Sequence, residues 1–128
     1  MENSSTQSSV TVMVVDDEFF FREMLRDVLA SGGFKVVAEA SNGVEAVEQY
    51  RRLRPQITIM DIFMPEQNGI DAIKEIIAFD KEAKILIYTG LGFDDDVDVA
   101  LKAGASEVIL KTFFPEEVTA VINKVLAG

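Results

Sequence analysis

Short apolar runs alternate with amphipathic segments along this chain, and this alternation restricts the possible folds more than any other feature. The five runs are Val10–Val15, Lys35–Ala40, Gln56–Met60, Lys84–Tyr88 and Glu107–Leu110. Four of them contain a stretch that does not alternate between apolar and polar residues, which is typical of strands buried on both faces of a parallel sheet. Each run therefore predicts a strand.

The segments between the runs predict five helices. The first spans about Glu18–Ser31 and carries an apolar stripe at helical spacing. The others are expected after Asn42, from Gly69, over Asp95–Ala103 and from Pro115. The residues expected to be buried are Phe21, Met24, Leu25, Val28 and Leu29 in the first helix, Val44, Val47 and Leu53 in the second, Ile70, Ile73, Ile76 and Ile77 in the third, and Val118, Val121, Ile122, Val125 and Leu126 in the fifth.

Strict alternation of strands and helices predicts an α/β fold with right-handed crossovers, in which helices cover both faces of a doubly wound parallel sheet. A length of 128 residues suits a single domain. We expect residues 1–9, which are mostly polar, to form a disordered tail and residues 10–128 to form the domain. The longest unbroken apolar runs have four residues. Since a membrane-spanning helix needs about 20, we expect no membrane insertion.

The residue types that are missing exclude several kinds of chemistry. The chain contains no cysteine and no histidine, so it has no thiol nucleophile, no Ser-His-Asp triad, no disulfide and no ordinary zinc site. Any metal ion must be held by oxygen, which favours magnesium, calcium or manganese. The absence of cysteine fits the cytosol, and we expect a cytoplasmic protein.

An excess of acidic residues argues against binding to nucleic acid. The chain has 22 acidic and 12 basic residues, with a formal net charge of −10. Such a surface repels phosphate backbones and anionic membranes unless basic residues cluster. Arg51-Arg52 is the longest basic run, so direct nucleic-acid binding is not expected.

Polar residues follow four of the predicted strands. Asp16-Asp17-Glu18 follows the first, Asp61 the third, Thr89 the fourth and Lys111 the fifth. The carboxyl ends of parallel strands meet at one edge of a sheet, where ligands bind. Carboxylates gathered there repel one another unless a cation lies among them, and Mg²⁺ fits best because it takes one or two carboxylates and leaves positions for phosphate oxygens. With a lysine and a hydroxyl added, this set predicts a site that holds a transferred phosphoryl group on a carboxylate.

Each of these residues also has an ordinary structural explanation. Asp16 or Asp17 alone is more often a helix N-cap, Asp61 a turn residue, Thr89 a strand end and Lys111 a solvated charge. Only their occurrence at four strand ends together favours a functional site. A carboxylate-nucleophile phosphatase is disfavoured, because its Asp-x-Asp loop needs an acidic residue where this chain has Phe63.

The chain closely resembles the receiver domain of two-component response regulators, and most of all the small single-domain chemotaxis type typified by CheY. The resemblance covers about Val10–Leu126. The matching pieces are Val14-Val15-Asp16-Asp17, Asp61-Ile62-Phe63-Met64-Pro65 with Gly69 after it, Thr89-Gly90, Lys102-Ala103-Gly104-Ala105, and Lys111. The resemblance implies a flavodoxin-like fold with strand order 2-1-3-4-5. It also implies that Asp61 is the phospho-acceptor, supplied by the phosphohistidine of a sensor histidine kinase or a phosphotransfer protein.

The resemblance further implies the roles of the other site residues. Asp17 would bind Mg²⁺ directly and Asp16 through water, and Asp61 and the backbone carbonyl of Phe63 would complete the protein ligands; Mn²⁺ is a second candidate ion. Lys111 would pair with a phosphoryl oxygen. Thr89 would move to hydrogen-bond the phosphoryl group.

Two positions depart from the family pattern. The family usually has an aromatic residue three positions before the lysine, where this chain has Val108. It also tends to follow the lysine with a proline across a cis peptide bond, where this chain has Thr112. A cis bond without proline costs about 3–4 kcal/mol, so the isomer of the Lys111-Thr112 bond is left open.

We therefore expect a signalling relay that is not an enzyme beyond its own phosphorylation and dephosphorylation. The surface formed by the fourth helix, fifth strand and fifth helix would bind an unknown downstream protein. The alternative is a phosphorylation-independent interaction module on the same fold. We further expect Phe20 to face solvent and to contact the phosphotransfer domain of the kinase; the alternative is partial burial against Phe113 or Phe114.

Overall fold

Five strands and five helices alternate along the chain. The computed structural model describes residues 9–64, 68–90, 94–111 and 114–128. The elements are β1 (Thr11–Val15), α1 (Phe19–Ser31), β2 (Lys35–Ala40), α2 (Gly43–Leu53), β3 (Ile57–Asp61), α3 (Gly69–Phe79), β4 (Ile85–Thr89), α4 (Asp94–Ala103), β5 (Glu107–Leu110) and α5 (Pro115–Ala127). The predicted order of elements is confirmed.

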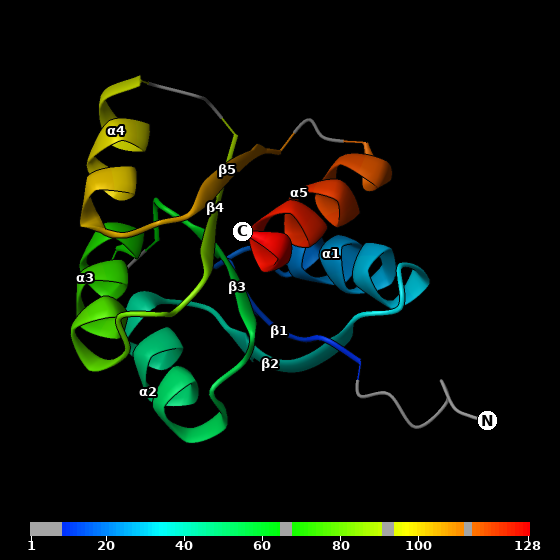
Figure 1. Ribbon diagram of the computed structural model, residues 1–128, viewed down its shortest axis with the longest axis horizontal. Coiled ribbons are helices and arrows are strands. Elements are labelled where there is room, and N and C mark those ends of the chain that lie inside the picture. Colours follow the sequence, from blue (N-terminus) through cyan, green and yellow to red (C-terminus); the bar gives the residue numbers. More distant parts are fainter. Residues whose placement is uncertain (1–8, 65–67, 91–93, 112–113) are drawn as a thin grey trace.

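All strands belong to one parallel sheet in the order β2-β1-β3-β4-β5. Helices α1 and α5 cover one face, and α2, α3 and α4 cover the other (Figure 1). The predicted doubly wound, flavodoxin-like fold is therefore confirmed. Strands β2 and β5 form the edges, and the chain crosses from β2 past β1 to β3, so the carboxyl ends of β1 and β3 are neighbours.

An apolar core lies on each face of the sheet, because the inner strands contribute side chains to both faces. In β3, Ile57 and Ile59 pack toward α1 and α5, whereas Met60 packs toward α2 and α3. Strands β3 and β4 are buried along their whole length. This two-sided burial explains why these strands lack apolar–polar alternation in the sequence.

Two residues expected in the core of α2 lie outside it. The exposed fraction of Val44 is 47% and that of Leu53 is 38%. The stripe that α2 buries consists of Gly43, Ala46, Val47 and Tyr50. Val44 is one residue, or about 100° of helix rotation, away from Gly43, so the expectation for Val44 and Leu53 was wrong while that for Val47 was right.

Several boundaries differ by one residue from the sequence-based expectation. Strands β3 and β4 extend to Asp61 and Thr89, α1 begins at Phe19 and α4 begins at Asp94. Residues 1–8 lie outside those that the structure describes, so the expected disordered tail stays a prediction. Among the described residues, no helix has the length and apolar character needed to cross a membrane.

Thr58 supplies a test of the packing of β3. Its hydroxyl is buried and has no hydrogen-bond partner among the described residues. Because an unpaired buried polar group destabilises a fold and valine has nearly the same shape, we expect Thr58→Val to raise the free energy of unfolding by about 1 kcal/mol. Urea denaturation measures this change.

Thr11→Val is the matched control. The Thr11 hydroxyl accepts a hydrogen bond of 3.0 Å from the Gln56 backbone N–H, so its removal is expected to lower stability. A Thr58→Val protein that is less stable than wild type would contradict the interpretation of Thr58.

Candidate functional site

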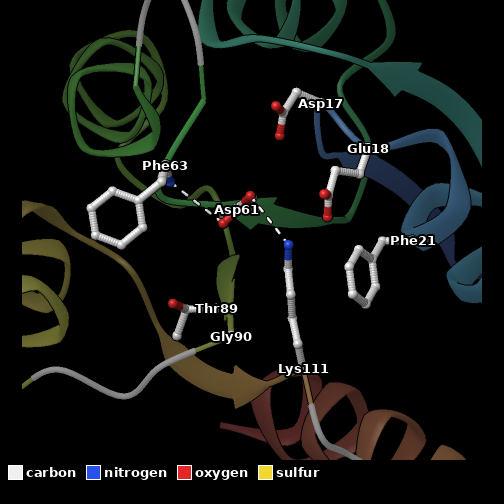
Figure 2. Close-up of a pocket in the computed structure, with 8 residues that line it drawn as sticks. All are labelled: Asp17, Glu18, Phe21, Asp61, Phe63, Thr89, Gly90 and Lys111. Atoms are coloured by element: carbon white, nitrogen blue, oxygen red, sulfur yellow. Dashed lines mark hydrogen bonds and ion pairs between the residues drawn. The ribbon is translucent and has the colours of Figure 1, made fainter.

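The carboxyl ends of four strands meet at one pocket. Asp16 directly follows β1, Asp61 and Thr89 are the last residues of β3 and β4, and Lys111 directly follows β5. The residues that line the pocket are Asp17, Glu18, Phe21, Asp61, Phe63, Thr89, Gly90 and Lys111 (Figure 2). The structure thus brings together all the candidate site residues, as the parallel topology predicts.

Three aspartates form a cluster at the centre of this site. Asp16, Asp17 and Asp61 each offer a carboxylate oxygen, and these oxygens lie within 4.8 Å of one another. Asp16 and Asp61 are buried, whereas Asp17 is exposed. Such a group of oxygen ligands, closed on one side and open to solvent on the other, could hold a hard divalent cation.

Backbone hydrogen bonds fix the acidic loop that follows β1. The Asp16 backbone N–H donates to the Ala40 carbonyl at 3.1 Å, which extends the pairing of β1 and β2 by one residue. The Glu18 backbone N–H donates to Asp16 Oδ1 at 2.9 Å, so the loop turns immediately after the strand. The turn leaves Asp17 and Glu18 on the rim of the pocket.

The position of Asp61 depends on a close approach of α3. The Gly69 backbone N–H donates to the Ile62 carbonyl at 2.8 Å. A Cβ atom on Gly69 would lie 2.4 Å from the Asp61 carbonyl oxygen, which is closer than atoms can pack, so only glycine fits. The Phe63 backbone N–H lies 3.4 Å from Asp61 Oδ1, as a long hydrogen bond.

Lys111 is the cation that the site itself supplies. Its Nζ lies 2.9 Å from Asp16 Oδ2 and 3.3 Å from Asp61 Oδ2. Its side chain is 11% exposed, and its backbone N–H donates to the Thr89 carbonyl at 2.7 Å. Burial alone would lower the pKa of Lys111, but its contacts with Asp16 and Asp61 outweigh burial and raise the pKa above its usual value. The lysine is therefore charged when the carboxylates are.

The carboxyl group of Asp61 is a weaker acid than an ordinary aspartate. Burial raises its pKa to about 6, and the nearby Asp16 adds to this, while the Lys111 ammonium and the Phe63 N–H act in the opposite direction. A buried carboxylate beside a second carboxylate and a single ammonium still lacks positive charge. A further cation would relieve this imbalance.

The remaining candidate residues occupy different parts of the pocket wall. Thr89 is 1% exposed, whereas the Phe63 side chain is 56% exposed at the pocket mouth. Val108, which stands where an aromatic residue was expected from the family pattern, is half-buried against the core under α2, α3 and α4. The Lys111-Thr112 peptide bond involves a residue outside those described, so its isomer stays open.

Sequence analysis missed one contact to the acidic loop. Arg22 Nη1 donates to the Asp16 backbone carbonyl at 2.7 Å, and its Nε lies 3.2 Å from Glu39 Oε1. Arg22 therefore ties the loop after β1 to strand β2. The sequence does place a basic residue in the first helix, one turn after the acidic residues that follow β1. Only the order of the strands in the sheet, however, shows that Glu39 lies beside Arg22.

The raised pKa of Asp61 predicts how stability depends on pH. In an unfolded chain an aspartate has a pKa near 4, so the folded protein binds this proton more tightly. We expect the free energy of unfolding of metal-free wild type to fall by about 2–3 kcal/mol relative to Asp61→Asn as the pH rises from 4 to 7. Chemical denaturation with a chelator present, at a series of pH values, measures this difference; parallel profiles would contradict it.

Comparisons with known proteins agree with this geometry. Residues 12–123 match the family model of the response regulator receiver domain. The chain is 50% identical over 114 residues to the chemotaxis protein CheY of Thermotoga maritima, covering 89% of this chain and 95% of the relative. It is 44% identical over 115 residues to the CheY of Bacillus subtilis, covering 90% and 96%.

Solved structures show the same fold. The CheX–CheY–BeF3–Mg²⁺ complex from Borrelia burgdorferi includes a chain with a TM-score of 0.90 and 31% identity, covering 97% of this chain and 94% of that chain. A two-component response regulator of the LuxR family from Aurantimonas sp. SI85-9A1 has a TM-score of 0.89 and 37% identity, covering 94% and 87%. The chain therefore belongs to the response regulator receiver domains, is similar to the CheY type among them, and takes part in two-component signalling.

Proposed function

We propose that this protein is a phospho-acceptor switch in which Asp61 receives a phosphoryl group from the phosphohistidine of a sensor histidine kinase or a phosphotransfer protein. The observation that carries the proposal is the contact of Asp61 with Lys111, within a cluster of two further carboxylates. Because the chain has no histidine, the donor must be another molecule. The alternative, an interaction module that never carries phosphate, gives no reason for so much like charge in one pocket.

The chemistry of the site suits Mg²⁺, or Mn²⁺ in its place. Asp16, Asp17, Asp61 and the backbone carbonyl of Phe63 would hold the ion, since all four offer the hard oxygen atoms that these ions prefer. The CheX–CheY–BeF3–Mg²⁺ complex from Borrelia burgdorferi, which this chain resembles, contains both Mg²⁺ and BeF3. When bound, the ion would neutralise the negative charge that gathers as a phosphate approaches the carboxylates.

The transfer step follows from the positions of three side chains. A carboxylate oxygen of Asp61 forms a bond to phosphorus as the bond between phosphorus and the donor imidazole nitrogen breaks, and the imidazole leaves. Lys111 exchanges its contact with Asp61 for one with a phosphoryl oxygen, and the Thr89 hydroxyl donates to another. Attack of water on phosphorus then returns Asp61 and releases inorganic phosphate. Beyond this self-phosphorylation and self-dephosphorylation we propose no enzymatic activity.

The proposed output surface lies on α4, β5 and α5. Val99 and Leu101 of α4 and Leu110 of β5 are 44%, 39% and 46% exposed, so this surface offers apolar side chains to a partner protein. The hydrogen bond from Lys111 to the Thr89 carbonyl links β4 to β5 directly at the site. We propose that this backbone contact transmits a movement of Thr89 to the surface, where Val108 replaces the usual aromatic residue.

Incubation with Mg²⁺ and a small acyl phosphate tests the proposal. We expect the intact mass of wild type to increase by one phosphoryl group and that of Asp61→Asn to stay unchanged. Lys111→Ala should slow the reaction about a hundredfold, because it removes a fixed positive charge from the transferred group. Asp71→Asn, at an exposed aspartate of α3, is the matched control and should react as wild type does. Absence of a mass gain in wild type would favour the phosphorylation-independent alternative.

Phe20 provides a separate test of how the donor protein docks. It is 70% exposed next to the phospho-acceptor edge, and its described ring contact is an edge-to-face one with Phe21, with ring centroids 5.6 Å apart. Phe114 is itself 71% exposed, while Phe113 lies outside the described residues. The expected solvent exposure of Phe20 is thus confirmed, and we propose that this ring contacts the phosphotransfer domain.

Phe20→Ala is expected to slow phosphotransfer from the donor protein about tenfold or more, because exposed aromatic anchors carry much of the energy of such interfaces. The rate with a small acyl phosphate should not change. Phe79→Ala removes another exposed phenylalanine, at the far end of α3, and is the matched control. Unchanged transfer from the donor protein to Phe20→Ala would show that Phe20 is not part of the interface.

A further inference from the structure

Two aromatic rings lie within cation–π distance of the ammonium group of Lys111. Lys111 Nζ lies 4.3 Å from the centroid of the Phe21 ring and 5.1 Å from that of the Tyr88 ring. Both distances are within the range of a cation–π contact. Figure 2 shows the Phe21 ring beside the extended Lys111 side chain, at the wall of the pocket.

The two rings are held in place by the fold. Tyr88 is the residue before Thr89 in β4 and is fully buried in the core under α1 and α5. Phe21 lies in the first turn of α1, half-buried against the same core. The rings meet edge to face, with centroids 6.0 Å apart and planes at 78°. This arrangement is favourable for aromatic pairs, so each ring restricts the other.

The Lys111 ammonium therefore contacts two carboxylates and two aromatic rings. In the proposed reaction, an Asp61 oxygen becomes bonded to phosphorus, and a bound metal ion would share the negative charge of Asp16, so both ion pairs would change. The attraction of an ammonium to a ring face depends on the ring and not on those carboxylates. The aromatic contacts are the part of the lysine environment that the reaction leaves intact.

We propose that Phe21 and Tyr88 are positioning residues, which hold the flexible Lys111 side chain so that its ammonium is already in place when the phosphoryl group arrives. This inference rests on the proposed phospho-acceptor function of Asp61. A lysine side chain has four rotatable bonds and loses considerable rotamer freedom when it is held in one conformation. If a ring holds the Lys111 side chain in place before the reaction, this loss of conformational entropy no longer adds to the barrier of the transfer step.

A packing role alone makes a different prediction. If Phe21 only fills space in the core, any side chain of the same shape suffices. If its ring attracts the ammonium, the electron density of the ring matters at constant shape, because the quadrupole of the ring supplies the attraction. Fluorine atoms withdraw this density and change the volume little, so they separate the two roles.

The first experiment replaces Phe21 by a trifluorinated phenylalanine through site-specific incorporation in the full-length chain. At saturating Mg²⁺ and acyl phosphate, we expect the rate constant of phosphorylation to fall about three- to tenfold, and the Mg²⁺ concentration for half-maximal rate to stay the same. The same fluorinated residue in place of Phe34, which is half-buried against the same core but away from the pocket, should leave the rate unchanged. Equal rates for the Phe21 replacement and wild type would overturn the proposal.

The second experiment does not depend on activity. In the metal-free protein, ring currents should shift the ε-methylene proton resonances of Lys111 away from those of the other lysines, and Lys111→Arg identifies them by their loss. We expect Phe21→Leu to move these resonances toward the values of exposed lysines and Phe21→Tyr to preserve them. Resonances that Phe21→Leu leaves in place would overturn the proposal even if the Leu variant were less stable.

The two experiments also separate this inference from the proposed function. If wild type gains no phosphoryl group on Asp61, the proposed function fails, while the Lys111 resonances still report on the rings. If wild type is phosphorylated and fluorination of Phe21 changes nothing, the phospho-acceptor function stands and the positioning role of Phe21 fails.

Discussion

The contact of one buried ammonium with two buried carboxylates is the interaction on which this site depends. Asp16 and Asp61 are almost fully buried, and a carboxylate removed from water is costly unless a positive charge compensates it. Lys111 supplies that charge to both, yet one ammonium against three clustered aspartates leaves the balance negative. The site could therefore attract a further cation, and Asp61, the proposed acceptor, both contacts the lysine and belongs to the aspartate cluster.

The parallel sheet accommodates this charged cluster without loss of its apolar packing. Strands β1, β3 and β4 bury apolar side chains on both faces, so charged residues are confined to the point where each strand ends. Since neighbouring parallel strands end at the same edge, these residues converge without any long loop. Gly69 completes the edge, because its missing side chain lets the start of α3 touch the backbone of Asp61.

The two layers of helices serve different parts of the site. The layer of α1 and α5 supplies Phe21, which lies over Lys111, and Arg22, which ties the acidic loop to β2. The layer of α2, α3 and α4 contains Val108 at its border and the exposed apolar side chains of α4. The aromatic surroundings of the lysine thus lie on the face of the sheet that α1 and α5 cover, whereas the proposed output surface includes a helix from each layer and the edge strand β5. The Lys111–Thr89 hydrogen bond joins β4 to β5 beside both.

The amino-acid pattern alone predicted the order of strands and helices, the two-sided burial of the sheet, and the meeting of Asp16, Asp17, Asp61, Thr89 and Lys111 at one edge, because the type and position of a residue along a strand decide these features. It misplaced Val44, which lies beside the stripe that packing buries, and Leu53, which is the last residue of α2. The contacts of Lys111 with Phe21 and Tyr88, and of Arg22 with Glu39, join residues far apart in the chain. These contacts could not be predicted from the sequence, because they depend on the angle at which α1 crosses the sheet and on which strands are neighbours.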